Sequence, residues 1–211
     1  MHLDDVGTMF AAAGGPTRAG GATRARGVVR ARGVVLTFDD AWADNHTNAL
    51  GPLSRHRLPA MLYAPSRLLG TLGYMTRSQL VEMDAADVTI GAHSRSHPDL
   101  RACTSRELES EVRGSKEDLE DLLGKPVTSF AYPTGLFDDR VVQAVRAAGF
   151  TSAVTTRAGW WRPGTDTLRI PRSFVQEVSE ATFRAAGRGG LNVLGSLDAI
   201  KRVGAGHRGT S

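Results

Sequence analysis

Residues 34–40 read Val-Val-Leu-Thr-Phe-Asp-Asp, an apolar run that ends in two adjacent carboxylates. A short apolar run of this kind predicts a buried β-strand over residues 34–38. Asp39 and Asp40 then follow the carboxyl end of that strand. In α/β folds the carboxyl ends of parallel strands converge on one face, where active sites lie. The sequence therefore places the Asp pair where chemistry is expected.

A second polar motif follows a second predicted strand in the same way. Residues 87–92 indicate the strand, and His93 and His97 come after it, four residues apart. Two imidazoles and one carboxylate form a three-ligand metal site with open positions. The remaining carboxylate is then free to act as a base. Taken singly, a His pair also occurs on solvated helix faces and an Asp pair also caps helices, but their shared position favours the metal site.

Strand and helix patterns alternate from residue 34 onward. The clearest helix spans residues 104–123, where Thr104 and Glu107 form a capping box and Gly124 supplies the stop. The predicted strands are 34–38, 60–64, 87–92, 127–131, 150–155 and 168–170, and the predicted helices are 45–57, 76–85, 104–123 and 138–148. Such alternation predicts a single α/β domain built on a parallel sheet.

The two ends of the chain differ in composition from this domain. Residues 1–32 hold five arginines among many Ala and Gly residues, and we expect a disordered arm there. Residues 186–211 are Gly-rich and are expected to form a C-terminal extension. Most of the formal net charge of +4 belongs to the arm, and no recognition module accompanies it, so we expect no nucleic-acid partner.

The sequence also bears on membranes and location. No apolar run approaches the ~20 residues that a membrane span needs, so we expect no membrane span. The first residues lack the basic region and apolar core of a signal peptide, which favours a cytoplasmic location for the chain as written. The sequence makes no prediction about the oligomeric state.

Residues 33–185 resemble the NodB-type polysaccharide deacetylases, carbohydrate esterase family four. Four motifs occur in the order and spacing of that family: Thr-Phe-Asp-Asp at 37–40, His-Ser-x-x-His at 93–97, Ala-Tyr-Pro-Thr-Gly at 131–135 and Leu-Arg-Ile-Pro-Arg at 168–172. The resemblance implies a distorted (β/α) barrel in a single domain and a divalent metal, most often Zn²⁺. It also implies the substrate, an N-acetylated amino sugar or glycan from which N-acetyl groups are removed.

The resemblance implies the roles of the site residues by position. Asp40, His93 and His97 would hold the metal. Asp39 would be the general base on metal-bound water, and Ser94 would steady the histidine loop.

The third motif implies the sugar groove. The segment Tyr132, Pro133 and Thr134 would line it, with the backbone N–H of Thr134 facing the oxyanion. For Tyr132, a position in the core is an equal alternative, because a large aromatic ring is also a common core residue.

Three positions depart from the family pattern. Ala41 stands where the family usually has Gly after the Asp pair. Ala131 stands where the family usually has an Arg that orients the base, and Pro171 stands where it usually offers a His as general acid. These departures leave the proton donor to the leaving amine unassigned.

Arg172 is the expected replacement for the missing arginine. It follows the last predicted strand, on the face where the other motifs gather. Its guanidinium is predicted to form a bidentate pair with Asp39 and so to hold that carboxylate in place. The alternative is a pair with a surface acid such as Glu177 or Glu180.

The sequence thus predicts a metal-dependent hydrolase that removes N-acetyl groups from an N-acetylated amino sugar or polysaccharide. Two alternatives stay open: an amidohydrolase of the same fold acting on a non-sugar amide, and a catalytically impaired carbohydrate-binding protein. A non-haem iron oxygenase also uses two His and one carboxylate. The spare carboxylate of Asp39 argues against that chemistry, because such an oxygenase needs no hydrolytic base.

Overall fold

The computed structural model describes residues 35–58, 60–159, 161 and 164–172. The predicted arm (1–32), the predicted extension (186–211) and the two acids considered as alternative partners of Arg172 lie outside the described residues. The domain boundaries therefore stay predictions.

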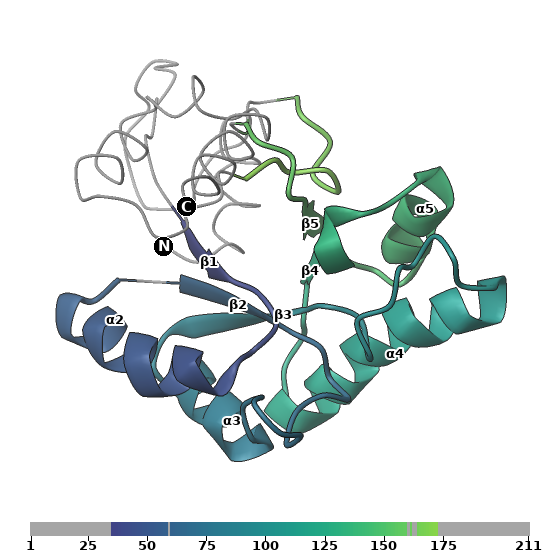
Figure 1. Ribbon diagram of the computed structural model, residues 1–211. Helices are drawn as coiled ribbons and strands as arrows, with labels where there is room; N and C mark the ends of the chain where they lie inside the picture. The colour runs from purple at the N-terminus through teal and green to yellow at the C-terminus, as the bar shows by residue number, and fades with distance from the viewer. Residues whose placement is uncertain (1–34, 59, 160, 162–163, 173–211) are drawn as a thin grey trace, which may run out of the picture.

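Five parallel strands form one sheet and follow one another in chain order, β1-β2-β3-β4-β5. They are β1 (Leu36–Phe38), β2 (Ala60–Ala64), β3 (Val88–Ala92), β4 (Ser129–Ala131) and β5 (Ser152–Val154). Because parallel crossovers are right-handed, a sheet built in chain order carries its helices on one face, as Figure 1 shows. The predicted α/β barrel class is confirmed, and the described strands form a half-barrel that is open between β1 and β5.

The sequence motifs predict most helix ends well. The helices are the π-helical η1 (Asn45–Ala49), α2 (Leu50–His56), α3 (Arg77–Ala85), α4 (Ser105–Leu123), the 3-10 helix η2 (Pro133–Gly135) and α5 (Asp139–Ala147). Thr76 and Thr104 each form a capping box with the residue three positions later, and Gly124 ends α4 with a left-handed φ of 67°. Within the described part of the chain, no helix is long and apolar enough to cross a membrane.

The helix predicted over residues 45–57 opens with a π-helical turn, η1, before α2 begins. Pro52 lies in the first turn of α2 and has no N–H to donate to the carbonyl of Asn48, so a regular α-helical ladder is interrupted there. This irregular turn lies shortly after the Asp pair, at the edge of the sheet where the polar motifs gather.

The inner strands of the sheet are largely buried on both faces, which explains why they are apolar runs rather than alternating patterns. All five residues of β2 are buried. Leu62 faces the main core under the helices, whereas Met61 and Tyr63 belong to a smaller cluster with Ala131 and Ile170. Because successive side chains of a strand point to opposite faces, one strand contributes to both clusters.

The strand predicted over residues 168–170 is wrong in extent. In the described segment Ile170 makes a single parallel bridge to Val154 and no longer strand forms. Pro171 comes next and has no N–H to continue a ladder. The bridge nevertheless holds this segment beside β5 and brings Arg172 to the carboxyl edge of the sheet.

Candidate active site

Three candidate ligands meet at the carboxyl edge of the sheet. Asp40 follows β1, and His93 and His97 follow β3, with β2 between the two strands. Oδ1 of Asp40 lies 3.5 Å from Nε2 of His93 and 3.4 Å from Nε2 of His97, and the three ligand atoms all lie within 4.8 Å of one another. Ligand atoms around a tetrahedral Zn²⁺ with bonds of ~2.0–2.1 Å are about 3.3 Å apart. The donor set and its spacing therefore fit one divalent ion.

A backbone hydrogen bond fixes the orientation of His93. Its Nδ1 lies 2.8 Å from the carbonyl oxygen of Ala131, and because a carbonyl only accepts, Nδ1 is the donor. The lone pair of Nε2 is then left to face Asp40 and His97. Burial and the neighbouring His93 lower the pKa of His97 below its ordinary value. This lowered pKa favours the neutral imidazole of His97, which is the form that binds metals.

Asp40 uses its two carboxylate oxygens differently. Oδ1 faces the histidines, while Oδ2 accepts a hydrogen bond from Nε1 of Trp42 at 3.2 Å. Trp42 in turn stacks on Tyr74, with ring centroids 4.3 Å apart. The contact with His93 lowers the pKa of Asp40 and outweighs the opposing effect of burial, so the carboxylate is ionised. The hydrogen bond from Trp42 also holds this carboxylate in one orientation.

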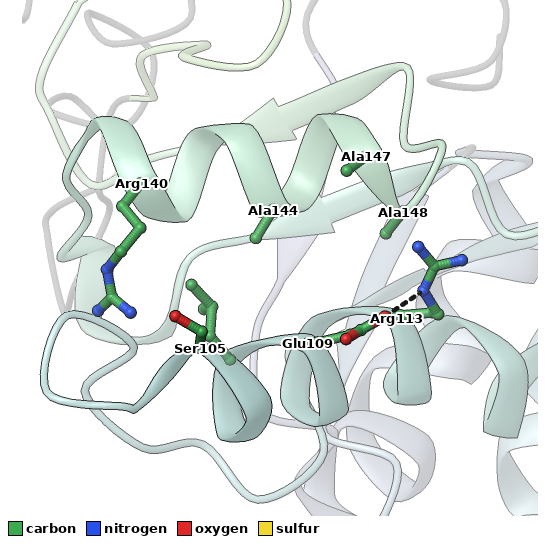
Figure 2. A pocket seen from close by; sticks show the side chains of 8 residues that line it. Ser105, Glu109, Arg113, Arg140, Ala144, Ala147 and Ala148 are labelled. Atoms are coloured by element: carbon green, nitrogen blue, oxygen red, sulfur yellow. Dashed lines mark ion pairs between the residues drawn. The ribbon is translucent and has the colours of Figure 1, made fainter.

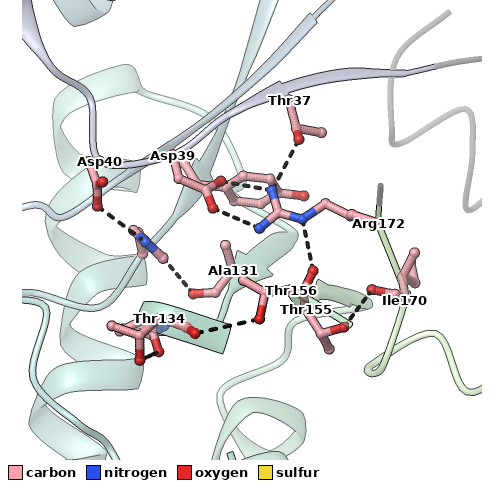
Figure 3. A network of polar contacts seen from close by, with 12 residues as sticks. Thr37, Asp39, Asp40, Ala131, Thr134, Thr155, Thr156, Ile170 and Arg172 are labelled. Atoms are coloured by element: carbon pink, nitrogen blue, oxygen red, sulfur yellow. Dashed lines mark hydrogen bonds and ion pairs between the residues drawn. The ribbon is translucent and has the colours of Figure 1, made fainter. Parts of the chain in front are cut away.

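Left-handed backbone conformations concentrate around these residues. Among the described residues, seven other than glycine have a positive φ, and five of them lie within or directly after the first three motifs: Asp40 (71°), Ala41 (57°), Ser94 (61°), His97 (60°) and Thr134 (55°). Each costs roughly 1–2 kcal/mol for a residue with a Cβ. The turn at Asp40 has a direct effect, because it lets the side chains of Asp39 and Asp40 point apart, as Figure 3 shows. Such clustered strain is typical of functional sites.

Arg172 holds the carboxylate of Asp39 at two points. Nη1 donates to Oδ1 at 2.8 Å and Nη2 donates to Oδ2 at 2.7 Å (Figure 3). Nη1 also donates to Oγ1 of Thr37 at 3.0 Å, and Nε donates to the carbonyl of Thr155 at 3.0 Å. Burial opposes the charge of Arg172, but the bonds to Asp39 more than offset this and raise the pKa of the guanidinium. The bidentate geometry expected from the sequence is present, and the catalytic role of Arg172 stays a prediction.

Ser94 joins the two ends of the histidine loop. Its side chain is fully buried, and its Oγ accepts the backbone N–H of His97 at 2.9 Å. The carbonyl of Ser94 accepts the N–H of Ser66 at 3.2 Å from the loop after β2. Both contacts fit the expected role of Ser94, which is to fix the conformation of the histidine loop.

Two of the three residues expected to line the sugar groove, Tyr132 and Pro133, are buried in the structure. Tyr132 is 1% exposed, its hydroxyl donates to the carbonyl of Leu168 at 2.8 Å, and its ring stacks on Phe137. A side chain packed in this way cannot line a sugar groove, and the core alternative holds. Pro133 is also buried, whereas Thr134 is exposed beside the site. The oxyanion role of Thr134 stays a prediction.

A hollow on the described surface lies away from these residues. It measures about 230 Å³ and runs between α4 and α5, where Ser105, Arg140 and Ala144 form part of its walls (Figure 2). None of the candidate site residues lines it. The chemistry of the side chains, rather than the depth of the surface, therefore identifies the candidate site.

Sequence reasoning missed the residues of α4 that contact the histidine loop. Glu111 accepts the N–H groups of Arg95 and Ser96, and Asp118 accepts from the guanidinium of Arg95. In the sequence both acids belong to the polar pattern of the helix, which does not distinguish an acid that faces a loop from one that faces water. Their seven-residue spacing, which places them on one side of the helix, is the signal that could have found them.

Known proteins share this sequence pattern. The family model described as "Polysaccharide deacetylase" matches residues 26–153. YxkH of Bacillus subtilis, provisionally named a polysaccharide deacetylase, is 27% identical over 125 residues, which are 59% of this chain and 45% of YxkH. The chitooligosaccharide deacetylase of Sinorhizobium fredii is 30% identical over 141 residues, which are 63% of this chain and 62% of that enzyme. The chain thus spans about half the length of the curated relatives it matches.

A solved structure shares the fold. The deacetylase PplD of Streptococcus pyogenes, determined in complex with acetate, superposes with a TM-score of 0.69 at 25% sequence identity. The superposition covers 74% of this chain and 70% of that one. The half-barrel described above is therefore an architecture already seen in a deacetylase.

Proposed function

Since this chain belongs to the polysaccharide deacetylase family, we propose that it is a metal-dependent hydrolase that removes N-acetyl groups from an N-acetylated amino sugar or polysaccharide. The observation that carries the proposal is the meeting of two groups at one edge of the sheet. One is the set of three candidate metal ligands. The other is the carboxylate of Asp39, which accepts two hydrogen bonds from the guanidinium of Arg172. Amide hydrolysis needs both, because an amide is a poor electrophile and neutral water is a poor nucleophile.

We assign Asp40, His93 and His97 to a divalent ion, and Zn²⁺ is the expected metal because this donor set suits it. When bound, such an ion polarises the amide carbonyl and lowers the pKa of the attacking water. The protein's own part is to present the donors in their binding forms, an ionised carboxylate and neutral imidazoles. The lowered pKa of His97 supports the neutral form of that imidazole.

Asp39 is assigned as the general base. It takes a proton from the attacking water while the new C–O bond forms at the acetyl carbon. Each carboxylate oxygen has two lone pairs, so the two bonds from Arg172 leave acceptor sites for that water. Arg172 limits Asp39 to one orientation, which is the task that the family usually gives to an arginine at the position of Ala131.

The leaving amine must receive a proton as the C–N bond breaks. Pro171 cannot donate one, so we assign this step to Asp39 as well, since it carries the proton taken from the water. The amine then leaves neutral together with acetic acid, which ionises to acetate by giving its proton to solvent or to the amine. The backbone N–H of Thr134 is assigned to the oxyanion that forms on the acetyl oxygen between the two steps.

Release of acetate tests the proposal. Chitooligosaccharides are the first substrates to try, because the Sinorhizobium fredii relative is named for them. We expect acetate from the Zn²⁺-loaded protein, none after treatment with a chelator, and recovery when Zn²⁺ is restored. A metal-loaded protein that binds these sugars without releasing acetate would instead favour the impaired carbohydrate-binding alternative.

A further inference from the structure

The candidate histidine ligands lie on a loop with an unusual backbone. Residues 93–97 leave β3 with two left-handed residues, Ser94 at φ 61° and His97 at φ 60°. A backbone with two such residues is strained, and it keeps its shape only when its surroundings fix it. The groups that fix the loop therefore determine where the two imidazoles point.

The carboxylate of Glu111 is the first of these groups. Glu111 is 9% exposed, and its Oε2 accepts the backbone N–H of Arg95 at 2.8 Å and that of Ser96 at 2.9 Å. Its Oε1 accepts the hydroxyl of Ser96 at 2.7 Å. Successive N–H groups next to a left-handed residue form a concavity that binds anions. Glu111 supplies that anion from α4 and so stabilises this loop conformation over others.

A second contact joins the histidine loop to α4. Nε and Nη2 of Arg95 donate to the two carboxylate oxygens of Asp118 at 2.8 Å and 2.7 Å. The guanidinium passes over Gly114, where an added Cβ would lie 2.2 Å from the guanidinium carbon. Glycine is unfavourable in the middle of a helix, so its presence there has a packing reason. Asp118 also accepts the hydroxyl of Ser66 at 2.7 Å, which ties in the loop after β2.

We propose that α4 is a positioning element for the metal centre. Glu111 and the pair formed by Arg95 and Asp118 hold the histidine loop so that His93 and His97 present their Nε2 atoms at one point. These groups act through the loop backbone and touch neither the metal nor the substrate. The inference rests on the proposed metal site and adds the residues that preorganise it.

Gly114→Ala separates positioning from stability. Alanine is the better helix former, which offsets part of the stability lost when the new methyl group displaces Arg95 from Asp118, so the variant should stay folded. The affinity for Zn²⁺, measured by calorimetric titration of the metal-free full-length protein, should fall about 10-fold, the lower end for groups that orient metal ligands. The absorption spectrum of the Co²⁺-loaded protein should change too, because it reports ligand geometry.

Glu111→Gln tests the buried anion, and Glu109→Gln is its matched control. Glu111→Gln keeps the size of the side chain but removes its charge, and the affinity for Zn²⁺ should fall about 10–100-fold. Glu109 is exposed on the same helix and pairs with Arg113 at 3.3 Å, as Figure 2 shows. Its substitution should leave both the affinity for Zn²⁺ and the Co²⁺ spectrum unchanged.

The outcomes separate this inference from the metal site beneath it. Wild-type affinity and an unchanged Co²⁺ spectrum in folded Gly114→Ala and Glu111→Gln would overturn the positioning role. If Glu111→Gln fails to fold, Gly114→Ala alone decides. A wild-type protein that binds no Zn²⁺ would overturn the metal site itself.

Discussion

Arg172 and Asp39 form a two-point ion pair although 133 positions separate them in the chain. The same guanidinium donates to Thr37 on β1 and to the carbonyl of Thr155 directly after β5. It therefore bridges the first and last strands of the half-barrel. One side chain therefore both supports the candidate base and links the two ends of the described sheet.

Arg172→Lys should lower kcat/KM about 100-fold even though the charge is kept. Lysine cannot supply two parallel N–H donors, and a small misplacement of a catalytic group can cost this much. Zn²⁺ content should stay at the wild-type level, because Arg172 contacts none of the candidate ligands. Arg169→Lys, which alters an ion pair with the exposed Asp139, is the control. Wild-type kcat/KM in Arg172→Lys would refute the positioning of the base.

Substitution by Asn should have different effects at the adjacent carboxylates of Asp39 and Asp40. Asp39→Asn should keep Zn²⁺ and lose ~10²–10⁴-fold in kcat, the usual contribution of a general base. Asp40→Asn should instead lose Zn²⁺, because it removes a charged ligand. Metal analysis and steady-state kinetics on both variants distinguish the two roles. Equal metal loss in both would show that the pair is assigned wrongly.

Zn²⁺ should stabilise the fold through the three ligands. At free Zn²⁺ of about 100 times Kd, the free energy of unfolding should rise by about 2.7 kcal/mol, since the ion binds the folded chain. Thermal unfolding with and without the metal measures this. In His97→Ala the stabilisation should shrink sharply, and a wild-type response there would place the ion elsewhere.

The pair of Asp118 and Arg95 should make stability depend on pH. Burial opposes ionisation of Asp118, but hydrogen bonds from Arg95 and Ser66 outweigh it and hold its pKa below the ordinary 3.8. A carboxyl with a lowered folded pKa stabilises above its unfolded pKa and loses that contribution as pH falls through the folded pKa. The free energy of unfolding of the wild type should therefore exceed that of Asp118→Asn at pH 6. Denaturant titrations should show this gap closing below about pH 4.

Tyr132→Phe tests whether the side chain of Tyr132 belongs to the core or to the substrate groove. The change removes the hydrogen bond to the carbonyl of Leu168 and should cost about 0.5–1.5 kcal/mol of unfolding free energy. KM for the oligosaccharide should stay unchanged, because the side chain is buried. A higher KM with unaltered stability would return Tyr132 to the substrate groove.

The elements that the sequence predicts well are those set by local rules. β2 is an uninterrupted apolar run because both its faces are buried, and its predicted bounds coincide with the observed ones. The Thr104 capping box places the start of α4, and Gly124 places its end. The strand exits follow from these elements, so the meeting of Asp40 with His93 could be expected before any coordinates.

The features that the sequence predicts poorly depend on tertiary contacts. Ala41 has a left-handed φ of 57° although no glycine marks the turn, because the surrounding fold imposes the conformation. Glu111 resembles any polar helix residue until the histidine loop is seen against it. The ladder expected over residues 168–170 ends at Pro171 after a single bridge, since pairing there depends on how the segment meets β5.

Arg172 lies late in the chain but pairs with Asp39, directly after β1. This pairing implies an order in which the parts of the candidate site form during synthesis on the ribosome. The candidate ligands and the carbonyl that orients His93 all precede residue 132, so they emerge before the partner of Asp39 does. We expect a chain ended at residue 170 to capture Zn²⁺ and yet turn over poorly, a difference that metal analysis and acetate release would reveal. Under the proposed function, hydrolytic activity would therefore begin only once Arg172 has been synthesised.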